Sequence, residues 1–156
     1  MQEGSWGKLS VIGGISFSPY GHATEQFTIL RHNAQAMRFI QFLLDVRRRY
    51  RRRLIVIWDG LRQHGQVSRL IEGLPGSWVD FIQLPSYAPE LNPVESLWSQ
   101  TKANKLANFT PHNLDELQPE VERVLTEAKH KQRLLHGFFR SAGLDPVPIG
   151  NLAEDQ

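Results

Sequence analysis

The chain has 156 residues, of which 40% are hydrophobic and 22% charged, with a formal net charge of +2 and no cysteine. This length suits one globular domain with a sizeable core, and the composition is typical of a folded protein rather than a disordered one. No run approaches the ~18 apolar residues of a membrane span, and the first residues lack the regions of a secretory signal. Disulfides and thiolate metal sites are excluded. We expect one cytoplasmic domain without a membrane partner.

The predicted elements begin with a β-hairpin and a helix. Residues 9–17 are rich in β-branched side chains and run into the turn signal at residues 18–21, and a second extended run covers about residues 24–30. From Asn33 the period changes to that of a helix ending near Tyr50, with apolar side chains at Ala36, Phe39, Ile40, Leu43 and Leu44.

Positive charge is concentrated in the segment that follows. Ten arginines lie between Arg31 and Arg69, against only Asp45 and Asp59. Such a stretch is suited to phosphate, and the candidates for contact with DNA are Arg47, Arg48, Arg49, Arg51, Arg52 and Arg53. The alternative is structural, because cations at the C-terminal end of a helix complement its dipole and other arginines are simply solvated.

A strand, helix and second strand follow the arginines. Residues 54–58 are a continuous apolar run, which predicts a strand covered on both faces. A helix over about residues 66–74 and a strand over 78–84 complete a parallel βαβ unit. Asp59 then stands at the carboxyl end of a buried strand, where open α/β sheets bind ligands. Its structural alternative is to open a turn with Gly60.

The last third of the chain is predicted to be helical. A proline-rich loop over residues 85–93 leads to a helix from Pro93 to about Ala107. Asn92 is the expected N-cap, so Glu95 has a structural alternative, namely bonding back to the Asn92 amide in a capping box. A further helix is expected over residues 114–129, with a continuation through about residue 139, and residues 143–156 are expected to be irregular.

Two stretches carry a family resemblance. Residues 84–98, Leu-Pro-Ser-Tyr-Ala-Pro-Glu-Leu-Asn-Pro-Val-Glu-Ser-Leu-Trp, closely resemble the signature around the last acidic residue of DDE-type transposases of the insertion-sequence and mariner superfamily. Residues 55–59 followed by His64 resemble that family's second-aspartate motif. Thirty-five residues stand between Asp59 and Glu95, about the family's spacing. The resemblance covers most of the chain, and we expect the catalytic core over residues 1–142.

The resemblance implies an RNase H-like α/β fold, a mixed sheet flanked by helices, and a DDE endonuclease that cleaves element ends and joins them to target DNA. Asp59 and Glu95 would be catalytic metal ligands for two Mg²⁺ or Mn²⁺ ions roughly 3.5–4 Å apart. His64 and Lys102 are accessory candidates, against a structural histidine and a solvated lysine. Tyr87 either stacks on a base or packs the proline-rich loop. When bound to DNA, the chain would associate with the nucleoid.

The sequence departs from the family at two places. Gly60 stands where the family usually has asparagine after the second aspartate. The family's first aspartate lies on a strand before residues 9–16, and no aspartate precedes Leu9. Glu3 and Glu25 are poor substitutes for that aspartate. Glu3 lies in a segment that does not have the pattern of a buried strand, and Glu25 lies beyond the hairpin turn. We therefore expect an N-terminally incomplete core whose missing strand comes from a second copy or an upstream polypeptide.

Three interpretations stay open at this point. The first is an active nuclease core, and the second is a non-catalytic remnant or DNA-binding module that keeps the fold. The third is an unrelated α/β domain in which Asp59 makes a turn and Glu95 caps a helix.

Overall fold

A computed structural model describes residues 7–144, except for the side chains of residues 104 and 105. The elements are β1 (Ser10–Phe17), β2 (Ala23–Leu30), α1 (Ala36–Tyr50), β3 (Leu54–Trp58), α2 (Arg62–Glu72), β4 (Val79–Gln83), the 3₁₀ helix η1 (Pro89–Leu91), α3 (Pro93–Gln100), the π-helical turn η2 (Thr101–Lys105), α4 (Leu114–Ala128) and α5 (Gln132–Ser141). This is a mixed α/β fold with small sheets. In the described part of the chain, no helix is long and apolar enough to cross a membrane.

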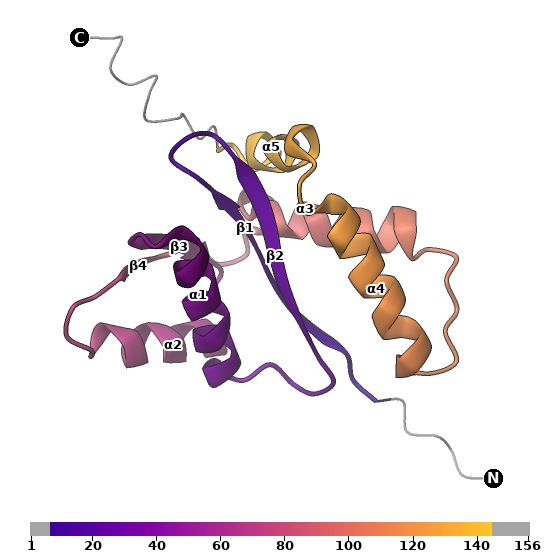
Figure 1. Ribbon diagram of the computed structural model, residues 1–156, viewed down its shortest axis with the longest axis horizontal. Helices are drawn as coiled ribbons and strands as arrows, with labels where there is room; N and C mark the ends of the chain where they lie inside the picture. The colour runs from indigo at the N-terminus through magenta and orange to yellow at the C-terminus, as the bar shows by residue number, and fades with distance from the viewer. Residues whose placement is uncertain (1–6, 145–156) are drawn as a thin grey trace.

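The predicted hairpin is confirmed. β1 and β2 pair antiparallel along their whole length, from Ser10 opposite Leu30 to Phe17 opposite Ala23. Gly21 takes a positive φ of 86° in the connecting turn, a conformation that glycine adopts without a steric penalty. The hairpin crosses the middle of the molecule, with β3, β4, α1 and α2 on one side of it and α3, α4 and α5 on the other (Figure 1).

The predicted βαβ unit is also confirmed, because β3 and β4 pair in parallel and α2 connects them. The prediction that residues 54–58 are covered on both faces is wrong. Alternate side chains of β3 pack against α1 and α2, whereas Ile55 is 68% exposed and Ile57 is 46% exposed. Ile82, directly opposite Ile57 on β4, is 50% exposed. Within the described residues, helices cover one face of this two-stranded sheet only.

The two sheets are separate. Over residues 7–144, β1 pairs only with β2 and β3 pairs only with β4, so no described strand bridges them. The two parts of the molecule meet through α1 instead. The Tyr50 hydroxyl hydrogen-bonds with Ser16 and accepts from Gln26 on the hairpin, and the Phe42 ring packs close to Gly14.

Two hydrophobic clusters correspond to these two parts. The strand cluster joins α1, α2, β3 and β4 through Leu43, Trp58, Val67, Ile71 and Val79. The hairpin cluster joins the hairpin, α3, α4 and α5 through Ala23, Leu97, Ala128, Leu135 and Phe138.

The helices of the hairpin side differ from the sequence prediction in their ends. The helix that begins at Pro93 keeps α-helical geometry only to Gln100 and then continues as the π-helical turn η2. The helix predicted over residues 114–129 ends at Ala128, and α5 is a separate helix rather than a continuation. Of the tail predicted to be irregular, residues 145–156 lie outside the described residues.

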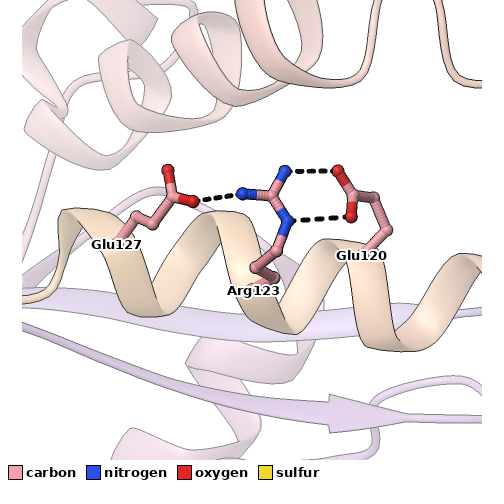
Figure 2. A network of polar contacts seen from close by, with 3 residues as sticks. All are labelled: Glu120, Arg123 and Glu127. Carbon is pink, nitrogen blue, oxygen red and sulfur yellow. Dashed lines mark hydrogen bonds and ion pairs between the residues drawn. The ribbon is translucent and has the colours of Figure 1, made fainter.

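α4 presents a charged outer face. The Arg123 guanidinium donates to the carboxylates of both Glu120 and Glu127, one turn away on either side (Figure 2). Arg123 holds the pKa of Glu120 below its ordinary value, chiefly by hydrogen bonding. Because these groups are solvent-accessible, the network contributes little to the free energy of unfolding.

Candidate metal centre

Asp59 is the first residue after β3, at the carboxyl end of that strand as predicted. The Leu61 N–H donates to Asp59 Oδ1 at 3.1 Å, so Asp59 does open a turn. The Leu84 N–H donates to the Trp58 carbonyl at 2.8 Å, which brings the residue after β4 alongside the residue before Asp59. The two chain segments that leave β3 and β4 therefore start from one edge of the sheet.

His64 holds the Asp59 carboxylate in place. Its Nδ1 lies 2.9 Å from Asp59 Oδ1 and 3.1 Å from the Asp59 carbonyl oxygen. The imidazole is stacked on Trp58, with ring centroids 4.4 Å apart, and meets the edge of Phe39. Trp58 is stacked in turn on Phe81. The His64 side chain is only 12% exposed, compared with 41% for Asp59. A rigid aromatic stack thus fixes a histidine that orients the more exposed carboxylate.

Both contacts to the Asp59 carboxylate use the same oxygen. Leu61 and His64 lie against Oδ1, and no described donor is bonded to Oδ2. Carboxylate oxygens are the ligands that Mg²⁺, Ca²⁺ and Mn²⁺ prefer. Asp59 can therefore serve a turn and a metal ion at once, and the structural and functional interpretations of this residue do not exclude each other.

Gly60 has a local explanation. A Cβ atom built at this position would lie 3.1 Å from Gln83 Nε2, closer than most van der Waals contacts. A larger residue at position 60 would require the Gln83 side chain to shift. Gly60, where the family usually has asparagine, therefore leaves room for the Gln83 side chain at the end of β4.

Glu95 is the third residue of α3. Asn92 caps this helix, since its Oδ1 accepts the Val94 N–H at 3.1 Å, and Pro93 occupies the first helical position. The Asn92 N–H donates to the Pro89 carbonyl at 3.0 Å rather than to Glu95. The capping-box alternative is therefore not realised. Among the described residues nothing donates a hydrogen bond to the half-buried Glu95 carboxylate, which is left for a ligand.

Tyr87 lies in the loop between β4 and α3. Its side chain is fully exposed, and its φ of 60° lies in the left-handed region that residues other than glycine rarely adopt. Packing of the proline-rich loop, one of the two explanations considered for this residue, is therefore wrong. Strained and exposed residues cluster at binding sites, where the surrounding structure holds them in place.

Lys102 lies in η2 and is exposed. Because η2 is a π-helical turn, the angular position of Lys102 relative to Glu95 differs from that in a continuous α-helix.

The six candidate arginines differ in their contacts. Arg48 is paired with Asp45, and Arg53 is paired with Asp80 through two hydrogen bonds. Arg47 lies over the Trp78 ring and Arg52 over the Tyr20 ring.

The two carboxylates come from different parts of the molecule. Asp59 follows a strand of the strand cluster, whereas Glu95 lies on the helix that contributes Leu97 to the hairpin cluster. Within residues 7–144, no group of three or more histidine, aspartate or glutamate side chains is arranged to hold a metal ion. Asp59 and Glu95 fit a divalent cation by chemistry, but they do not form a three-carboxylate set with another described residue.

Glu25 is an acid that sequence reasoning set aside. It is completely buried on β2, opposite Ile15, and neither carboxylate oxygen has a hydrogen-bond partner among the described residues. Burial raises its pKa to about 7, and the charge of Lys129 opposes this only partly. The sequence signal was a glutamate within a strand whose other residues, apart from Gln26, are apolar or β-branched.

Comparison with known proteins gives one family. No curated protein and no solved structure matches the chain. The family model of the DDE superfamily endonucleases matches residues 1–118, which include β1 to α3 and therefore both Asp59 and Glu95. This match spans most of the chain, and it agrees with the resemblance seen in the two acidic motifs. The chain belongs to the DDE superfamily endonucleases, the family of DDE-type transposase catalytic domains.

Proposed function

We propose that this chain is the catalytic portion of a DNA transposase, which cleaves element ends and joins the freed 3′-hydroxyls to target DNA. Family membership supports a nuclease that acts on DNA. The observation that carries the proposal is the state of Asp59: it follows a parallel strand, His64 orients it, and Oδ2 has no bonded donor among the described residues.

The residues of the chain have distinct roles in this proposal. Asp59 and Glu95 would hold Mg²⁺ or Mn²⁺, and His64 is a positioning residue that fixes the Asp59 carboxylate. A bound pair of metal ions would supply activation of the attacking oxygen and stabilisation of the leaving oxygen of the phosphate. Lys102 is exposed on the continuation of the Glu95 helix and is suited to a backbone phosphate.

The third carboxylate comes, in this proposal, from a further strand. An RNase H-like sheet would place that strand between β1 and β3, each of which has one edge without a partner strand among the described residues. The exposed side chains Ile55 and Ile57 on β3 support an additional covering element beside this strand. A second copy of the chain or an upstream polypeptide would supply it.

A second candidate function is a non-catalytic DNA-binding module that keeps the fold. The observation in its favour is that Asp59 and Glu95 have no third acid beside them in residues 7–144.

Mn²⁺-dependent nicking of a supercoiled plasmid separates the two functions. We expect the 156-residue chain alone to be inactive, and a version extended by an aspartate-bearing strand to nick DNA. In the extended version, Asp59→Ala and Glu95→Gln abolish nicking, whereas the matched control Glu90→Gln, on the exposed helix η1, retains it. Nicking by the short chain would contradict the need for a supplied strand, and an inactive extended version that still binds DNA would favour the module.

His64→Phe tests the positioning role. Phenylalanine keeps a ring to stack on Trp58 but removes the Nδ1 contact to Asp59. We expect the Mn²⁺ concentration for half-maximal nicking to rise, on the order of 10-fold or more, with little change in melting temperature. An unchanged Mn²⁺ dependence would show that His64 is structural only.

Tyr87→Gly tests the exposed loop. Glycine accepts the positive φ without strain, so the fold should be retained or slightly stabilised. Loss of base stacking should weaken binding of single-stranded DNA by about 1–3 kcal/mol, measured by fluorescence titration. Equal affinities of the two proteins would exclude a stacking role.

A further inference from the structure

The arginines at the junction of α1 and β3 form a cluster whose charge is only partly compensated. This arginine cluster consists of Arg47, Arg48, Arg49, Arg51, Arg52 and Arg53. All six are exposed, and two described carboxylates, those of Asp45 and Asp80, pair with Arg48 and Arg53. Positive charge therefore remains in excess on this surface.

Aromatic rings hold two of the other arginines. The Arg47 guanidinium carbon lies 5.0 Å from the Trp78 ring centroid, and that of Arg52 lies 5.9 Å from the Tyr20 ring centroid. A ring positions a guanidinium without neutralising it, because it carries no net charge. Arg47, Arg48 and Arg51 also line one open groove of about 500 Å³, together with Leu44. Its lining offers guanidinium donors and no carboxylate.

The cluster lies at the opposite end of β3 from Asp59. Arg53 directly precedes β3 and Asp59 directly follows it, six positions later. Extended chain rises about 3.3 Å per residue, so these two positions are roughly 20 Å apart. Duplex DNA rises about 3.4 Å along its axis per base pair, and roughly 20 Å measured along that axis therefore corresponds to about six base pairs.

We propose that the arginine cluster is a second DNA contact, which binds the phosphate backbone of duplex DNA about six base pairs from the phosphate at Asp59. The inference rests on the proposed function, because it takes DNA as the substrate. Guanidinium groups suit phosphate through paired N–H donors, and stacked arginines lose less conformational freedom on binding. An acidic protein segment is the competing ligand, and membership of a nuclease family favours DNA.

Salt dependence of binding tests the ligand. Binding of a duplex of about 20 base pairs, which is longer than the roughly six base pairs between the two contacts, is followed by fluorescence anisotropy at increasing NaCl, without divalent metal. We expect Arg47→Gln/Arg51→Gln to weaken binding on the order of 10-fold and to reduce the slope of log K against log salt by about 2. Arg47→Lys/Arg51→Lys should keep most of that slope. The matched control, Arg133→Gln/Arg140→Gln on α5, removes the same charge far along the chain from the cluster and should change binding by less than about 2-fold.

Two results of this titration overturn the inference. Equal losses in the test and control variants would mean that only net charge matters. Tight binding of polyglutamate that disappears in Arg47→Gln/Arg51→Gln, with DNA binding unchanged, would assign the cluster to an acidic protein partner.

Footprinting tests the position. Because the chain has no cysteine, Ser86→Cys provides a single thiol in the loop that leaves β4. A disulfide to a duplex with one tethered thiol then fixes the register. We expect hydroxyl-radical protection at the tether and again about six base pairs away, with the second region lost in Arg47→Gln/Arg51→Gln. Protection at the tether alone would falsify the second contact. Since this measurement needs no cleavage, a failed nicking assay leaves its result interpretable.

Discussion

The two parts of the molecule differ in how completely their hydrophobic side chains are buried. In the hairpin part, three helices close the core, and Leu97, Leu125 and Leu135 are at most 1% exposed. In the strand part, Ile55, Leu70 and Leu74 are each more than half exposed, although the same part has a well-packed core of its own. Glu95 belongs to the closed part and Asp59 to the open one. The metal site proposed for these two carboxylates would therefore join two parts of the molecule that differ in how far their hydrophobic side chains are covered.

The largest expected effect contrasts a leucine from each part. Leu135→Ala removes a fully buried side chain from the hairpin cluster and should lower the free energy of unfolding by about 2–5 kcal/mol. Leu70→Ala, on the exposed face of α2, should change it by less than about 0.5 kcal/mol. Urea denaturation measures both. Equal effects would mean that the α2 face is covered in solution, which would remove the contrast between the two parts.

Glu25 makes the hairpin part sensitive to pH. Because its folded-state pKa, about 7, lies above its ordinary value of 4.5, the folded chain favours the protonated acid. This stabilisation is complete below about pH 4.5 and is lost as pH rises to about 7. The loss amounts to roughly 3 kcal/mol at most.

Glu25→Gln, which is neutral at every pH, should remove that loss. Urea denaturation at pH 5 and pH 8 should show a large difference for the natural chain and a small one for the variant. Glu72→Gln, an exposed acid at the end of α2, is the control and should retain the natural pH dependence. If Glu25→Gln keeps the full dependence, other groups are responsible for it.

Two adjacent glycines compare the two faces of β1. A Cβ at Gly13 would lie 2.6 Å from the Trp98 ring of α3, whereas one at Gly14 would lie 3.6 Å from the Phe42 ring of α1. Gly13→Ala should therefore destabilise the fold by about 1–3 kcal/mol. Gly14→Ala makes an ordinary contact and should be neutral or slightly stabilising. Thermal unfolding of the two variants checks this, and the reverse order would mean that α1 packs more tightly on the hairpin than α3 does.

The smallest effect on stability is expected at the open face of β3. Ile55→Thr and Ile57→Thr keep β-branched side chains and should change the free energy of unfolding by less than about 0.5 kcal/mol. They should nevertheless weaken association with a supplied strand or covering element, measured by sedimentation. A loss of several kcal/mol in the isolated chain would show that these side chains are already buried.

Local patterns predicted most of the elements. Runs rich in β-branched residues and a turn signal located the hairpin, an unbroken apolar run located β3, and the order of Asn92, Pro93 and Glu95 located the start of α3. These signals depend only on residues close together in the sequence, so they can be recognised without knowledge of the tertiary structure.

Burial that depends on contacts between residues far apart in the sequence was not predicted. The sequence of β3 suggested burial on both faces, but exposure of Ile55 depends on which strands and helices lie nearby. Likewise, Glu25 looked unsuitable for chemistry from its position along the chain, whereas its complete burial arises from helices far along the sequence. For Asp59, a turn and a metal site looked like competing roles, and the two roles are compatible because both contacts to the carboxylate use Oδ1.

Within residues 7–144, β1 and β3 each have one edge without a partner strand, and this has a consequence for handling the protein. A strand edge presents a row of free N–H and C=O groups, and it invites pairing with strands of other molecules. Here the β3 edge lies next to exposed isoleucines, a combination that favours aggregation. The fraction of the isolated chain that stays in solution should therefore fall as its concentration rises, and the further strand proposed above would reduce this aggregation by pairing with the edge.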